Sequence, residues 1–200
     1  MARGDALWGV SDLDLVIAFD HPNPSDTALK REVEAAVRTR FPGGDALVIQ
    51  RIASDRLQQM SEGTRAYWLY SCKHDAEVLY GAPAAEFLPA PPKGMKLASL
   101  IKPIIKRDGQ ALLDKSCLKR NESRHIAKRI LNGLALPSIA QGTANFIAPS
   151  ESKKLNLPAN LFKQLDAVIE VYCRAPELTD LRLLSKIWKQ AWDYIETKLE

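Results

Sequence analysis

The segment L-P-A-P-P-K-G at residues 88–94 limits what this chain can fold into more than any other feature. It contains Pro89, Pro91 and Pro92 and ends in glycine, so neither a regular helix nor a central strand can run through it. Short stretches typical of strands precede this segment, and long helical periodicity follows it. We therefore predict a linker at residues 89–94, between a domain at residues 1–88 and a helical domain at residues 95–200.

Before the linker, the pattern alternates between strand and helix. Ser25 or Asp26 can cap a helix that ends near Arg40, and apolar, β-branched or aromatic runs predict strands around it. The predicted strands are residues 11–19, "ALVIQRI" at 46–52, "TRAYWLYS" at 64–71 and a short one in "HDAEVLYGAP" at 74–83. Strand, helix and strand in this order predict a small α/β sheet, so the whole chain is expected to be α+β.

After the linker, nearly every segment is predicted to be helical. Residues 96–107 form the first candidate, with Pro103 expected to kink or end it, and residues 110–136 form one or two more. "LPANLFKQLDAVIEVYCRA" at 157–175 is amphipathic, and a last helix begins at Asp180. In this last helix the apolar stripe is formed by Leu184, Ile187, Trp188, Ala191, Trp192, Ile195 and Leu199. We interpret the stripes as core.

The charge of the chain is unevenly distributed. Its formal net charge is +4, but residues 93–131 contain 11 Lys and Arg against 3 acids, which gives +8 and leaves −4 for the rest. The basic stretch could form one wall of a site for a metal and a polyanion. Alternatively, it consists of helices with solvated lysines.

Cysteine content and hydropathy indicate the compartment. Cys72, Cys117 and Cys173 are widely spaced and odd in number, which is typical of reduced thiols and not of a disulfide framework or zinc site. No apolar run approaches the roughly 20 residues that a membrane span needs, and Arg3, Asp5 and Asp12 interrupt any signal-peptide core. We expect a cytoplasmic protein without a membrane partner.

Two aspartates interrupt the first predicted strand, in "GVSDLDLVIAFD" at residues 9–20. Because side chains alternate along a strand, Asp12 and Asp14 are expected on one face and Leu13 and Leu15 on the other. Two neighbouring carboxylates repel each other on a half-buried surface. A divalent metal would remove this cost, as in phosphate chemistry.

The stretch "ARGDALWGVSDLDLVIAF" resembles the nucleotidyltransferase superfamily, which includes DNA polymerase beta and the aminoglycoside nucleotidyltransferases. Gly9, Ser11, Asp12 and Asp14 match the second half of its signature, Gly-x-Ser-Asp-x-Asp on a strand. The resemblance implies a small mixed-sheet domain followed by a helical bundle. It also implies two Mg²⁺ ions on Asp12 and Asp14, with Ser11 at the nucleotide. The expected reaction transfers a nucleoside monophosphate, AMP if the triphosphate is ATP, to an acceptor hydroxyl and releases pyrophosphate.

The first half of that signature, a Gly-Ser pair on a turn, would lie upstream of Ala2. Either the reading frame begins too late or part of the triphosphate cradle is missing, so the catalytic domain is expected to be truncated at its N-terminus. The alternative is a catalytically impaired nucleotidyltransferase-like module that binds a partner protein, as an antitoxin does. Retention of both Asp12 and Asp14 argues against this alternative, because two carboxylates without a metal gain nothing.

Further site residues follow from the same resemblance. Asp45 stands where a third metal-binding carboxylate would fall, with Asp55 and Glu62 as substitutes, although Asp45 also fits a turn after two glycines. "NESRHIAKRILNGLAL" at residues 121–136 resembles the family helix "A-K-R-I-L-R", and the expected triphosphate ligands there are Arg124, Lys128 and Arg129. The alternative is a solvent-facing basic helix. Glu122 is a weaker candidate for the general base.

The sequence leaves the acceptor open: a small molecule, a protein side chain or an RNA end. RNA binding as the main function is the least favoured hypothesis, because aromatic residues make up only 7% and do not alternate with basic ones. A second copy of the chain or another protein remains a candidate partner.

Overall fold

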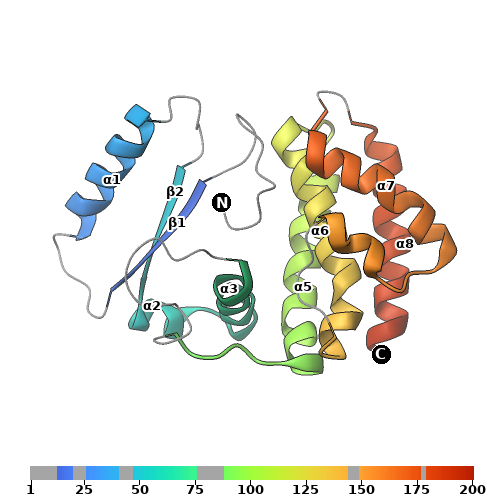
Figure 1. Ribbon diagram of the computed structural model, residues 1–200, viewed down its shortest axis with the longest axis horizontal. Coiled ribbons are helices and arrows are strands. Elements are labelled where there is room, and N and C mark those ends of the chain that lie inside the picture. The colour runs from blue at the N-terminus through green and yellow to red at the C-terminus, as the bar shows by residue number, and fades with distance from the viewer. Residues whose placement is uncertain (1–12, 20–25, 41–46, 76–87, 144–148, 177–178) are drawn as a thin grey trace. The chain divides into compact units, whose positions relative to one another are not determined.

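The computed structural model describes residues 13–19, 26–40, 47–75, 88–143, 149–176 and 179–200 (Figure 1). These residues form two compact units, one ending at Ser61 and the other running from Glu62 to Glu200. Residues 88–93 belong to neither helix nor strand, as their prolines predict. The division between the units falls before this segment, since the second unit also contains the helix that precedes it.

The first unit is built around a strand–helix–strand motif. Strand β1 (Leu13–Phe19), helix α1 (Asp26–Arg40), strand β2 (Leu47–Ala53) and the short helix α2 (Ser54–Gln59) follow one another. β1 and β2 pair in parallel, from Leu13 opposite Leu47 to Phe19 opposite Ala53. Parallel neighbours need a crossover connection, which α1 provides. The sequence predictions for β1, α1 and β2 are confirmed within two residues at each end.

The second unit is a bundle of helices (Figure 1). Its elements are α3 (Glu62–Asp75), α5 (Gly94–Leu113), α6 (Arg120–Ala140), the 3₁₀ helix η1 (Pro149–Lys154), α7 (Ala159–Arg174) and α8 (Leu181–Leu199). Helix α6 is central, because α5, α7 and α8 all pack on it, and α3 packs on α5. From Ile126 to Pro137, every residue of α6 except Lys128 is buried. The hydrophobic core of this unit therefore surrounds α6.

The two C-terminal helices agree with their predicted amphipathic pattern. Leu161, Leu165, Val168 and Tyr172 of α7 are buried. The predicted stripe of α8 is buried from Leu184 to Ile195, and Leu199 is partly buried. Asp180 caps α8, because its carboxylate accepts the backbone N–H groups of Arg182 and Leu183 at 2.9 and 3.2 Å. Both helix predictions are confirmed.

The predicted α+β fold class, with a mixed sheet, is wrong. Among the described residues from Glu62 onward every regular element is a helix, and the two strands described before Ser61 are parallel to each other. The main error is "TRAYWLYS", which lies within helix α3 and not in a strand. Its aromatic residues favour a strand intrinsically, but Ala66, Leu69 and Tyr70 share a helical spacing and are buried. Burial of that face has overridden local propensity.

Two other expectations about local structure have different outcomes. Pro103 does not end its helix, because α5 continues through it to Leu113. Pro103 and Ser99, one turn earlier, are both exposed, so water can satisfy the carbonyl that proline leaves without a donor. The short strand expected in "HDAEVLYGAP" lies outside the described residues, apart from His74 and Asp75 at the end of α3.

Candidate functional site

The carboxylates expected to hold metal lie largely outside the described residues. Asp14 is the second residue of β1, paired with Val48 of β2, whereas Ser11, Asp12 and Asp45 fall outside the described ranges. Within those ranges, no group of three or more His, Cys, Asp or Glu side chains could hold a metal ion. The expected Mg²⁺ site therefore stays a prediction. Of the substitute carboxylates, Asp55 lies in α2, and Glu62 begins α3 and pairs with Lys96 at 3.5 Å.

The predicted phosphate ligands belong to helix α6, where they have different environments. Lys128 is half-buried. Arg124 is also half-buried, and its Nε donates to the backbone carbonyl of Tyr172 at 2.9 Å. The Arg124 guanidinium also lies 4.2 Å from the centre of the Tyr172 ring, a favourable cation–π geometry. Arg124 therefore connects α6 to α7.

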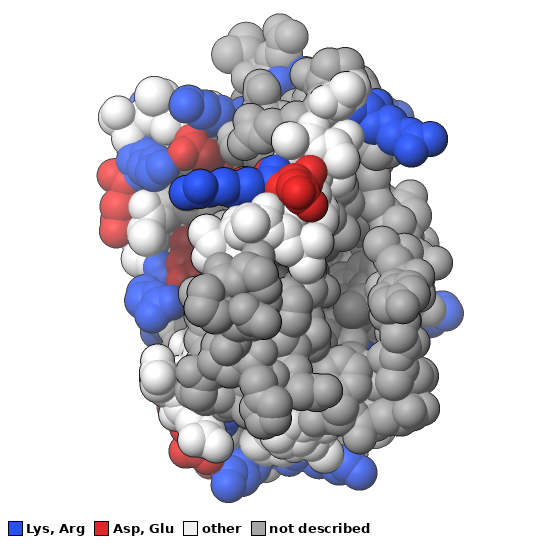
Figure 2. Space-filling model, turned by 90° about the vertical axis from the view of Figure 1, so that its left-hand side faces the viewer, with Lys and Arg blue, Asp and Glu red and all other residues white. Residues whose placement is uncertain are grey.

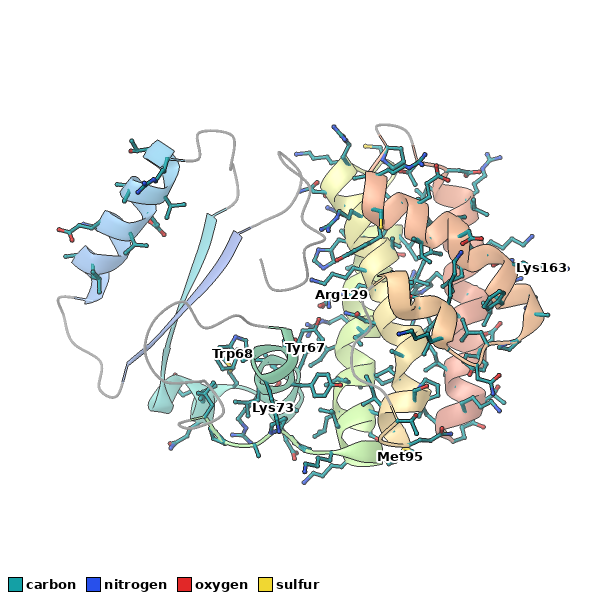
Figure 3. All side chains as sticks on the ribbon, in the orientation of Figure 1. Tyr67, Trp68, Lys73, Met95, Arg129 and Lys163 are labelled. Carbon is teal, nitrogen blue, oxygen red and sulfur yellow. The ribbon has the colours of Figure 1, made fainter. Side chains whose placement is uncertain are left out.

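Arg129 is the centre of a partly buried polar cluster with Tyr67 and Asp108, which we call the Arg129 cluster (Figure 3). Its Nη1 donates to the Tyr67 hydroxyl of α3 at 2.5 Å, and its Nη2 donates to Oδ2 of Asp108 in α5 at 3.0 Å. The Arg129 side chain is 10% exposed and that of Asp108 is 27% exposed. One guanidinium thus joins three helices, and a partly desolvated ion pair of this kind is costly to break.

Two features of the Arg129 cluster concern its chemistry. The Arg129 Nε is buried and has no hydrogen-bond partner among the described residues, so within them the cluster is not fully satisfied. Asp108 also accepts from the exposed Arg107, which keeps the carboxylate paired on both oxygens. In this arrangement Arg129 holds three helices together through its ion pair with Asp108 and its hydrogen bond to Tyr67. A contact with triphosphate would require the pair with Asp108 to open. Sequence reasoning missed Tyr67 and Asp108, since neither lies in a motif.

His125 is next to these cations on α6. Burial, followed by the positive charges of Arg129 and Lys128, lowers the pKa of His125 from 6.5 to about 4. The residue is nevertheless exposed overall, so its desolvation is partial. The imidazole is neutral at pH 7.

Glu122, the weaker candidate for a general base, caps its own helix. Its Oε1 accepts from Lys115 Nζ at 2.5 Å, and its Oε2 accepts the backbone N–H of Lys119 at 2.8 Å. The hydrogen bond from Lys115, followed by that from Lys119, lowers the pKa of the Glu122 carboxyl. These contacts stabilise the carboxylate and make it a weaker base.

The basic stretch at residues 93–131 is largely engaged within the bundle. Ion pairs hold five of its cations: Lys96, Lys106, Arg107, Lys115 and Arg129. Arg120 donates to the backbone carbonyl of Ala175 at 2.7 Å. Figure 2 shows the side at the left of Figure 1, where α1 is drawn and not this stretch, and there too basic and acidic side chains lie beside one another. Asp108 and Glu122 are already counted in the +8 of this stretch, so only the pairs with Glu62 and Glu196 reduce that excess, to +6. The sum alone does not define an anion site.

Cys72, Cys117 and Cys173 form no disulfide in the part of the chain that the structure describes. None of the helices in the described ranges combines the length and apolarity that crossing a membrane requires. Comparison with known proteins adds no assignment: no protein family, no curated protein and no solved structure matches this chain.

Proposed function

We propose that this chain is a Mg²⁺-dependent nucleotidyltransferase that moves AMP from ATP to an acceptor hydroxyl. The observation that carries the proposal is the sequence Gly9-x-Ser11-Asp12-x-Asp14, which leads directly into strand β1. The motif resembles that of the nucleotidyltransferase superfamily. A strand gives paired carboxylates at alternate positions a common face, which suits a shared metal.

The proposed donor set fits the proposed metal. Asp12, Asp14 and Asp45 offer only carboxylate oxygens, the hard ligands that Mg²⁺ prefers. When bound, the metal would polarise the α-phosphate and favour ionisation of the acceptor hydroxyl. Lys128 keeps its predicted role as a ligand of the triphosphate, whereas Arg129 supports the position of α6 through Asp108 and Tyr67. We also propose a cytoplasmic location, because three widely spaced cysteines without a disulfide suit a reducing compartment.

The first test is calorimetric titration of the chain with an α,β-methylene analogue of ATP, with and without Mg²⁺. We expect binding that needs the metal and is lost in Asp12→Asn/Asp14→Asn. Asp166→Asn, which removes an exposed acid on α7, is the matched control and should bind as the wild type does. Circular dichroism establishes that each variant is folded.

Two results would overturn the proposal. One is the absence of metal-dependent binding by a folded wild-type chain. The other is equal binding by the wild type and the double variant, which would place the nucleotide away from the aspartates. If binding behaves as expected, release of pyrophosphate from ATP in the presence of pools of small-molecule, protein and RNA acceptors then identifies the acceptor class.

A further inference from the structure

The helical unit has a groove of about 730 Å³ between α5 and α8, which we call the α5–α8 groove. Its charged lining residues are four cations and two acids: Lys106 from α5, and Arg182, Lys186, Lys189, Asp193 and Glu196 from α8. It contains none of the residues proposed for nucleotide or metal. Any function of this groove is therefore separate from the proposed transferase chemistry.

Three of the cations form a row along α8. Arg182, Lys186 and Lys189 have the spacing i, i+4 and i+7, which places them on one helical face over about 10 Å. All three are exposed, and none forms an ion pair with another described residue. This row contrasts with the basic stretch at residues 93–131, where many charges are neutralised within the bundle.

The other end of the groove is different in charge. Lys106 pairs with Glu196, and its Nζ lies 5.5 Å from the centre of the Trp192 ring. Glu196 therefore already neutralises the charge of Lys106. Asp193 adds a second carboxylate at this end. The groove therefore has a positive row followed by a neutral to negative end, a polarity that only a ligand with a matching pattern can satisfy.

We propose that the α5–α8 groove binds an acidic helical segment of a partner protein. Carboxylates at i, i+4 and i+7 of such a helix would match the row formed by Arg182, Lys186 and Lys189, and a helix lying along a groove is a common mode of peptide recognition. Gln110 and Ser185, which also line the groove, can donate or accept hydrogen bonds with polar side chains beside those carboxylates.

The same observations disfavour a nucleic acid in this groove. Binding of single strands relies on exposed aromatic rings on which bases stack, but Trp188 and Trp192 are only 5% and 4% exposed. Asp193 and Glu196 would repel a backbone that carries a negative charge on every residue. A protein segment can instead change its charge along its length.

The test measures binding of a defined acidic helical peptide by fluorescence anisotropy at physiological salt. The probe is labelled with fluorescein and carries glutamates at the spacing of the cationic row. The groove variant is Arg182→Glu/Lys186→Glu/Lys189→Glu. The control variant, Lys73→Glu/Lys93→Glu/Lys163→Glu, changes the net charge equally at exposed sites elsewhere on the unit (Lys73 and Lys163 are labelled in Figure 3).

We expect the groove variant to weaken binding by about tenfold or more and the control by less than about threefold, since rim charges contribute modestly but add up. The groove variant should also bind a peptide in which lysines replace the glutamates, because direct contacts are restored by exchange of charge. If the triple variant is unstable by circular dichroism, Lys186→Gln/Lys189→Gln replaces it, with the same direction expected.

Three results would overturn the proposal: no saturable binding by the wild type, equal losses in the groove and control variants, or tighter binding of an oligouridylate of equal charge. The first two would leave the cationic row as a solvated surface. The third would make the groove a nucleic-acid site. Titration with the ATP analogue is unaffected by any of these outcomes, so failure here is distinguishable from failure of the proposed transferase activity.

Discussion

Helices α6 and α8 belong to the same bundle but differ in how much of their surface is buried. α8 is amphipathic: Leu184, Ile187, Trp188, Ala191, Trp192 and Ile195 are buried, while Lys186, Lys189 and Asp193 between them are exposed. α6 is buried on nearly all sides from Ile126 to Pro137 and includes the buried polar residues Arg129 and Asn132. Periodicity suffices to specify a helix at the edge of a core. A helix in the centre also needs partners for its polar groups.

The largest effect should come from truncation of an apolar side chain on α6. Ile130 is 1% exposed, and we expect Ile130→Ala to lower the free energy of unfolding by about 4 kcal/mol, because lost burial and a cavity add up. Leu183→Ala is the control on the outer side of α8, where Leu183 is 40% exposed, and should cost less than about 1 kcal/mol. Urea denaturation measures both. Equal losses would mean that the two helices do not differ in burial.

Removal of the positive charge of Arg129 on α6 should have the second-largest effect on stability. Arg129→Ala leaves Asp108 and the Tyr67 hydroxyl without their buried partner, which we expect to cost about 3 kcal/mol. Arg107→Ala is the control, because its side chain is 71% exposed and should change stability by less than about 0.5 kcal/mol.

The double variant Arg129→Met/Asp108→Leu makes the test sharper. It removes both charges and keeps most of the volume, so its loss of stability should be smaller than that of Arg129→Ala alone. Chemical denaturation of the two variants side by side provides the comparison. A double variant as unstable as the single one would show that Arg129 contributes through packing and not through its ion pair.

The packing of α8 against α5 predicts an intermediate effect. A Cβ added at Gly109 of α5 would lie 2.0 Å from the Trp188 ring of α8, whereas one at Gly133 of α6 would meet Ile195 Cδ1 at 3.1 Å and Trp192 Cζ2 at an ordinary contact distance of 3.8 Å. We therefore expect Gly109→Ala to destabilise by about 2 kcal/mol, since a rigid ring must move. Gly133→Ala should be close to neutral, because the flexible end of an isoleucine can shift and alanine favours the helix. Thermal unfolding distinguishes the two.

The contrast between amphipathic helices at the edge of the core and segments whose structure depends on tertiary burial explains how much of the molecule could be predicted from the sequence. The apolar stripes of α7 and α8 and the β1–α1–β2 order follow from periodicity, and both are confirmed. The helix at "TRAYWLYS" was missed because its consecutive aromatics show no alternation to distinguish strand from helix, and tertiary burial of Ala66, Leu69 and Tyr70 decided it. Local patterns do not contain that information.

The candidate site illustrates a related limit. Sequence resemblance selects Arg129 for its charge, but its ion pair depends on Asp108 and Tyr67, which lie 21 and 62 residues away along the chain. No spacing rule connects residues on three different helices. The same applies to the α5–α8 groove, where Lys106 and Glu196 are 90 residues apart.

The smallest predicted effect concerns His125, which is exposed although it belongs to the largely buried α6. Its folded-state pKa, about 4, lies below the 6.5 of a free imidazole, so protonation favours the unfolded chain. The charges around it are Arg124, Lys128, Arg129 and Asp108, of which the cations oppose protonation and Asp108 favours it. The contribution of His125 to the free energy of unfolding should therefore be fully present above pH 6.5 and fall as the pH is lowered toward 4, by less than about 1 kcal/mol once partial exposure is taken into account.

His125→Gln should flatten that part of the pH profile of stability, and NMR titration of the His125 ring gives its pKa directly. A value near 6.5 would show that the cations of α6 are screened by water, which would bring the environment of this part of α6 closer to that of α8.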